Sequence, residues 1–305
     1  MDITNSIVFA CTMIRNPRLA LRTVRQLYPD REPRTVKVLV GQADSDPIVL
    51  TENSSPQEIE RAIVETEKTV LASASTRGAR FDLYFEDDEV VIVVEMQREA
   101  EPLIVNRAVF ISSILSAYLT HRGASYFDLK QMRVAFICLH DPFGFGECYN
   151  PIELRLLRHT DYELNGTPRI DIFFAGGNNA GLDDNIKELM AYLMNPNAYN
   201  ITGSHNDLIP ALQAAAQEVL KDGRVTAMVE LAILHEESMA KKYRQEGLQE
   251  GLRRGRLEEK RQIASTLLGL GYPYDDIIKT TGCTWDQLDA LKRDALAGRP
   301  SGDNA

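Results

Sequence analysis

The chain has little cysteine, little histidine and no long apolar run. Its four cysteines lie far apart and form no C-x-x-C pair, which argues against a zinc site or a redox motif. Its five histidines show no H-E-x-x-H pattern, so a zinc hydrolase of that type is also excluded. The longest strongly apolar run, Val90 to Val94, is far shorter than the roughly 20 residues of a membrane-spanning helix. Residues Met1 to Asn16 show no secretory signal, and we expect a cytoplasmic protein with reduced thiols and no membrane partner.

Basic residues are in the minority. The 305 residues include 34 Lys and Arg against 44 Asp and Glu, for a net charge of −10. That balance excludes a protein held on nucleic acid by bulk charge, because such affinity comes from basic residues that replace counterions. A local basic patch remains compatible with the total. Between Met239 and Arg261 there are eight basic and four acidic residues, so this stretch carries +4 and the rest of the chain −14.

The apolar periodicity changes repeatedly between helix and strand up to residue 174, in a chain long enough for about two domains. This alternation predicts an α/β core. The Asn165-Gly166 pair also predicts a two-residue hairpin between Leu154 to Leu164 and Pro168 to Phe174. The expected elements before it are one or two helices in Ile7 to Tyr28, a strand at Val36 to Val40, a helix at Ser54 to Ala72, a hairpin of Arg80 to Phe85 with Val90 to Met96, a helix at Leu103 to Leu119 and a strand at Val134 to Leu139.

Beyond Asp207 the pattern is wholly helical. We expect helices at Leu208 to Leu220 and Val225 to His235, then a charged helical connector, then a tail with breaks near residues 271–273 and 281–284. Glycine recurs every four residues at 247, 251 and 255, which indicates either a closely approaching partner helix or a flexible, partly helical connector. We expect the tail to be either a helix-turn-helix or a small dimerising or packing bundle, in which case these C-terminal helices are the candidate surface for a homodimer. The expected divisions are 1–235, 236–261 and 262–305.

Two carboxylates in the first hairpin form the main candidate site. A turn centred on Asp87 and Asp88 places Asp82 opposite Val93 and makes it a diagonal neighbour of Glu95. Such a pair is close enough for both carboxylates to hold one divalent cation. A carboxylate that directly follows five apolar strand residues is costly to bury without a partner or a metal. An ordinary salt bridge from Glu95 to Arg80 or Arg107, without any chemistry, explains the same pattern.

The order of several motifs resembles the PD-(D/E)XK nuclease family transposases, the recombination-promoting nuclease (Rpn) group. The resemblance covers most of the chain from Gly78 onward. It lies in Gly78-Ala79-Arg80-Phe81-Asp82-Leu83-Tyr84, Val94-Glu95-Met96-Gln97, Asn106-Arg107, Gly123-Ala124-Ser125-Tyr126, Phe136-Ile137-Cys138, Asp141-Pro142-Phe143-Gly144 and the connector Glu246 to Arg256.

This resemblance implies a restriction-endonuclease-like core, a central mixed sheet flanked by helices, that binds Mg²⁺ and cuts DNA. It implies that Asp82 and Glu95 hold the metal and that Gln97 stands in place of the superfamily's lysine. An amide orients water but carries no positive charge and does not act as a base. Arg80 and Arg107 are the candidates for binding the substrate phosphate, and for each of them an ordinary ion pair is an equal alternative.

The leading functional hypothesis is therefore a Mg²⁺-dependent DNA endonuclease associated with recombination or mobile elements. The glutamine at position 97 supports a second hypothesis, a nuclease-like core that no longer cuts and binds DNA or a protein partner. A third, a purely structural α/β scaffold, predicts neither cutting nor salt-sensitive DNA binding.

Overall fold

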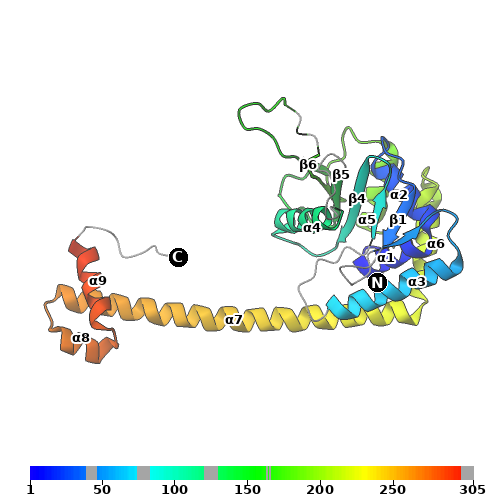
Figure 1. The fold of residues 1–305 in the computed structure, drawn as a ribbon. Coiled ribbons are helices and arrows are strands. Elements are labelled where there is room, and N and C mark those ends of the chain that lie inside the picture. Colours follow the sequence, from blue (N-terminus) through cyan, green and yellow to red (C-terminus); the bar gives the residue numbers. More distant parts are fainter. Residues whose placement is uncertain (39–46, 74–82, 120–129, 163, 165, 297–305) are drawn as a thin grey trace. The chain divides into compact units, whose positions relative to one another are not determined.

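The computed structural model describes residues 1–38, 47–73, 83–119, 130–162, 164 and 166–296 (Figure 1). Internal contacts divide the chain into two units, Met1–Ile233 and Leu234–Ala305, which are treated separately below. The first unit is α/β, as the alternating pattern predicts, and the second is helical. Among the described residues, no helix is both long and apolar enough to cross a membrane.

A seven-stranded mixed sheet in the order β2-β1-β3-β4-β5-β7-β6 forms the centre of the first unit. Strands β4, β5 and β7 run parallel, and the remaining pairs are antiparallel. Burial on both faces explains the continuous apolar runs in β4 and β5. The strands are β1 (Thr35–Val38), β2 (Ile48–Leu50), β3 (Leu83–Glu86), β4 (Val90–Gln97), β5 (Gln131–Cys138), β6 (Tyr149–Ile152) and β7 (Arg169–Phe174).

Helices cover the two faces of this sheet unequally (Figure 1). The helix α4 (Ile104–Leu119) packs on one face over Val91, Val93 and Phe136. The opposite face carries the larger core. The helices that contribute to that core are α1 (Ser6–Arg15), α2 (Pro17–Leu27), α3 (Pro56–Ser73), α5 (Asp184–Met194) and α6 (Leu208–Leu220), and a short 3-10 helix η2 (Ile201–Gly203) precedes α6.

The amino end of α1 depends on one side chain. The Asn5 Oδ1 atom accepts hydrogen bonds from the backbone N–H groups of Ile7 and Val8, at 3.1 and 3.3 Å. Both of these residues are buried, so the N–H groups have little access to water as a substitute. We expect Asn5→Ala to lower stability by about 1 kcal/mol and the melting temperature by about 2 to 4 °C. Asn5→Ser keeps an acceptor and should melt close to the parent in the same circular dichroism experiment.

The predicted register of the first hairpin is wrong by two residues. Val93 pairs with Tyr84, not with position 82. The reason is that Glu86 belongs to the strand, where Lys37 and Lys130 bind its carboxylate, and the turn begins one residue later. Asp87 closes that turn, since its Oδ1 accepts the N–H groups of residues 89 and 90 at 2.8 and 2.7 Å. A shift of two residues leaves every side chain on its predicted face.

The predicted second hairpin is also wrong. β7 pairs with β6, and the described residues between them, 153–162, 164 and 166–168, include only an isolated bridge between Leu156 and His159. Residue 165 of the proposed Asn-Gly turn lies outside the described residues. The apolar residues of 154–157 that indicated a strand are exposed, so they pack against no sheet.

The helix α7 (Gly223–Gly269) is continuous where the sequence indicated a helix, a partly helical connector and a further helix. Its first turns pack against α1 and α6 through Val225, Met228 and Val229. Glu250 pairs with Arg253 and Arg254 one turn ahead, at 2.7 and 2.8 Å, and such pairs offset part of the cost of the repeated glycines. No other described part of the chain comes within 4 Å of a Cβ added at these glycines.

In the second unit, the end of α7 packs with two short helices, α8 (Tyr274–Thr281) and α9 (Trp285–Leu296). Their breaks fall where the sequence predicts them. Gly282 ends α8 in the left-handed conformation at φ +66°, and the Gln287 side chain accepts the N–H of Thr284 at 2.9 Å.

Candidate functional site

Three of the predicted site residues come together on the α4 face of the sheet. Strand β4 alternates sides, so Glu95 and Gln97 follow Val91 and Val93 on the same face. They lie beside Phe136 and Cys138 of the parallel strand β5. Glu95 is only 8% exposed. The third residue, Arg107, is the fourth residue of α4, which covers this face.

The Arg107 guanidinium joins Glu95 to Gln97. Its Nη2 donates to Glu95 Oε2 at 3.1 Å and its Nη1 donates to Gln97 Oε1 at 2.9 Å. The guanidinium also lies over the Phe136 ring, 5.7 Å from the centroid. The Gln97 amide is fixed at both ends, because its Nε2 donates to the backbone carbonyl of Glu99 at 2.9 Å. An acid oxygen and an amide oxygen therefore converge on one cationic group.

This group lies at the carboxyl ends of two parallel strands, the usual place for a binding site in an open α/β sheet. A pocket of about 220 Å³ opens there. Burial raises the pKa of the Cys138 thiol to about 12, although the charge of Arg107 acts in the opposite direction. Burial therefore favours the neutral thiol of Cys138 over the thiolate, which is the nucleophilic form. The pocket is lined by Gln97, residues 99–102, Ile104, Cys138 and residues 140–142.

A loop with an ordered backbone follows β5 at the edge of this pocket. The carboxylate of Asp141, which lines the pocket, accepts the N–H groups of Phe143, Gly144 and Gly146 at 3.0, 2.9 and 2.6 Å. These bonds, that of Gly146 most of all, hold the pKa of the Asp141 carboxyl below its ordinary value. In the sequence this segment enters only as a motif of the resemblance, Asp141-Pro142-Phe143-Gly144, and its ordered backbone was not predicted.

The other two predicted residues, Arg80 and Asp82, lie outside the described residues. Among the residues that are described, His, Cys, Asp and Glu form no group of three that could hold a metal ion. Mg²⁺ usually keeps several waters and takes only one or two carboxylates from the protein. The donor set of Glu95 and Gln97 fits such an ion, because both oxygens are hard donors and both already converge on a cation.

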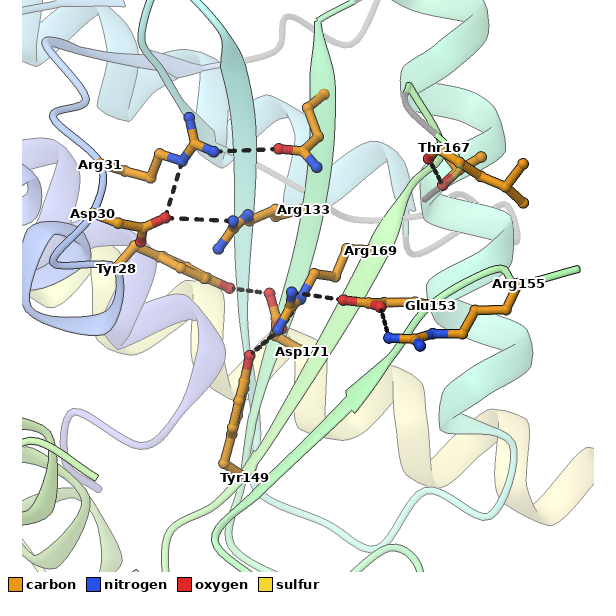
Figure 2. A network of polar contacts seen from close by, with 12 residues as sticks. Tyr28, Asp30, Arg31, Arg133, Tyr149, Glu153, Arg155, Thr167, Arg169 and Asp171 are labelled. Atoms are coloured by element: carbon orange, nitrogen blue, oxygen red, sulfur yellow. Dashed lines mark hydrogen bonds and ion pairs between the residues drawn. The ribbon is translucent and has the colours of Figure 1, made fainter. Parts of the chain in front are cut away.

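A second polar cluster occupies the opposite face of the sheet, at the amino ends of β5 and β7 (Figure 2). Asp171 is fully buried, and its Oδ1 accepts from Tyr149 Oη at 2.7 Å and from Arg169 Nε at 2.9 Å. Its Oδ2 accepts from Tyr28 Oη at 2.8 Å. Arg169 also binds Glu153 at 2.7 Å. Burial, and then the charge of Asp171, raise the pKa of Tyr149 to about 12.

This cluster holds three elements together. It joins the end of α2, through Tyr28, to the neighbouring strands β6 and β7. Both oxygens of Asp171 accept hydrogen bonds, which is what a buried carboxylate requires. Sequence reasoning missed this cluster, although Asp171 within Arg169 to Phe174 carries the same signal as Glu95, a carboxylate inside an apolar strand.

Comparison of the chain with protein-family models, with curated proteins and with solved structures found no match.

Proposed function

We propose that this protein is a Mg²⁺-dependent DNA endonuclease of the PD-(D/E)XK type, as the resemblance in its motifs implies. One observation carries the proposal: an acid, an amide and an arginine converge beside a pocket at the carboxyl ends of parallel strands. Asp82 enters on sequence grounds. The resemblance puts it at the position of the family's metal-binding aspartate, and it lies outside the described residues.

In this proposal Asp82 and Glu95 hold the metal, and the Gln97 amide positions the attacking water. When bound, Mg²⁺ supplies Lewis-acid polarisation of the phosphate and lowers the pKa of a coordinated water. Hydrolysis forms a bond from the water oxygen to phosphorus and breaks the bond from phosphorus to the leaving sugar oxygen. The water proton passes to solvent, and the leaving oxygen takes a proton. Arg107 binds the phosphate, whose charge two carboxylates and one divalent ion leave unbalanced.

A second candidate function has an observation of its own. Arg107 bonds to both Glu95 and Gln97, which is also what a structural ion pair in an inactive core would do. Such a protein binds DNA or a protein partner through the same fold without cutting. The two candidates differ in whether the protein cuts DNA, and in the first candidate the cutting requires the carboxylates.

Supercoiled plasmid incubated with the full chain and Mg²⁺ tests the proposal. We expect nicking by the parent, and at least a hundredfold loss in Asp82→Ala and Glu95→Ala. Glu89→Ala removes an exposed carboxylate at the other end of β4 and serves as the matched control, with unchanged nicking expected. DNA binding without cutting in Mg²⁺ or Mn²⁺ would support the inactive core. The absence of both cutting and salt-sensitive binding would support the scaffold.

A further inference from the structure

The loop after β5 holds one aromatic side chain out into solvent. Phe145 is 71% exposed, although burial of a phenylalanine side chain ordinarily stabilises a folded protein. Its neighbour Phe143 is its anchor, since it packs against the core under α4. The two rings lie 5.8 Å apart between centroids and are tilted by 30°. Phe145 is thus supported on one side and open on the other.

The backbone on both sides of Phe145 is fixed. Gly144 and Gly146 have φ angles of +73° and +71°, which L side chains rarely adopt. The Asp141 carboxylate binds both of their N–H groups. The carbonyl of Gly146 accepts the N–H of Asn178 at 2.7 Å, which ties the loop to the segment after β7. The exposure of the ring therefore belongs to an ordered loop and not to a loose one.

The surroundings of Phe145 favour a flat ligand. A Cβ added at Gly144 or Gly146 would meet nothing within 4 Å, so the backbone on both sides of Phe145 borders open space. The two glycines beside Phe145 have no side chain that would enlarge an apolar contact with a protein partner. The same carboxylate that holds the loop lines the pocket that contains Gln97. An aromatic platform thus adjoins the candidate site for phosphodiester chemistry.

We propose that Phe145 stacks on a nucleobase of the substrate, so that the site takes nucleic acid with an unpaired base, such as a single strand or a locally opened duplex. The proposal rests on the proposed function and specifies its substrate class. Stacking on aromatic side chains is the general means by which proteins hold unpaired bases, because every base has a π-face. The pocket wall carries Glu99, Glu101 and Asp141, so we expect binding to need a divalent cation to offset their charge.

Binding of the full chain to a fluorescein-labelled single-stranded oligonucleotide in Ca²⁺, followed by anisotropy, tests this proposal separately from cutting. We expect Phe145→Ala and Phe145→Leu to weaken binding about tenfold or more, and Phe145→Trp to retain it. Phe145→Trp should also quench an aminopurine placed in the oligonucleotide. Leu157→Ala removes another exposed apolar side chain, 95% exposed, and should bind as the parent does.

Parental affinity in Phe145→Ala would overturn the stacking proposal, as would full recovery in Phe145→Leu, since leucine restores apolar contact without a π-face. If the protein nicks plasmid while either of these results is obtained, the endonuclease proposal is supported and only the stacking proposal is wrong. Stacking-dependent binding without nicking would support the stacking proposal and contradict the endonuclease proposal. No binding to any oligonucleotide together with no plasmid nicking would contradict both proposals.

Discussion

Replacing Arg169 by methionine should lower the free energy of unfolding of the first unit by about 3 to 5 kcal/mol. Asp171 is fully buried, and Arg169 is the cation that its carboxylate contacts, at 2.9 Å. Methionine keeps much of the volume of the arginine stem but leaves a buried carboxylate without its counter-charge. The same change removes the Arg169 hydrogen bond to Tyr149, at 2.7 Å. Two tyrosine hydroxyls still donate to the carboxylate, but they supply no positive charge.

The neighbouring Arg155 provides the matched control. It pairs with Glu153 at 2.9 Å, but its side chain is 58% exposed, so Arg155→Met should cost at most about 1 kcal/mol. Asp171→Asn in the Arg169→Met background removes the uncompensated charge and should recover part of the loss. Equal effects of the two arginine changes would contradict the assignment of Arg169 as the buried counter-charge.

The position of the single tryptophan decides how this unfolding is followed. Trp285 belongs to the helical second unit, where it lies 5.0 Å from the Tyr274 ring. Its fluorescence therefore reports on that unit. Urea unfolding of the first unit should be followed by far-ultraviolet circular dichroism, which responds to the loss of the sheet and its helices. The unfolding transition followed by tryptophan fluorescence should therefore be the same in Arg169→Met as in the parent.

The sequence predicts elements well where the local signal and the packing agree. The helix α6 runs from Leu208 to Leu220 in both, because its apolar spacing matches the face that it buries. The strand β5 follows from a run buried on both faces. The long helix α7 was divided too finely, since repeated glycines lower local helix propensity while side-chain pairs one turn apart sustain the helix.

The positions of strands relative to one another are harder to predict, because they depend on partners distant in sequence. The hairpin turn shifts by two residues because Lys37 and Lys130 hold Glu86 within the strand, and neither lysine is near it in the chain. The convergence of Glu95, Gln97 and Arg107 was accessible, since alternation and one helical crossover suffice to bring them together. The buried carboxylate of Asp171 was accessible in the same way, but its partners were not, because Tyr28, just beyond α2, is 143 residues away in the chain.

Replacing Arg107 by alanine should separate its two effects on the proposed reaction. The guanidinium orients Gln97 and is placed to bind the phosphate, so the maximal nicking rate should fall about a hundredfold, as for the loss of a transition-state hydrogen-bond donor. Arg107 also places a positive charge against Glu95, at 3.1 Å, where it opposes a second cation. The Mg²⁺ concentration for half-maximal nicking should therefore fall by about fivefold or more.

A merely structural ion pair would not change these two quantities in opposite senses. Arg107→Lys keeps the charge but loses the planar fork that reaches both oxygens, so we expect a rate between those of the parent and Arg107→Ala with a Mg²⁺ requirement near that of the parent. Titration of plasmid nicking against Mg²⁺ gives both values for each variant, and circular dichroism confirms that each is folded. An unchanged rate in Arg107→Ala would remove Arg107 from the site. A lowered rate with an unchanged Mg²⁺ requirement would instead place the metal away from Glu95.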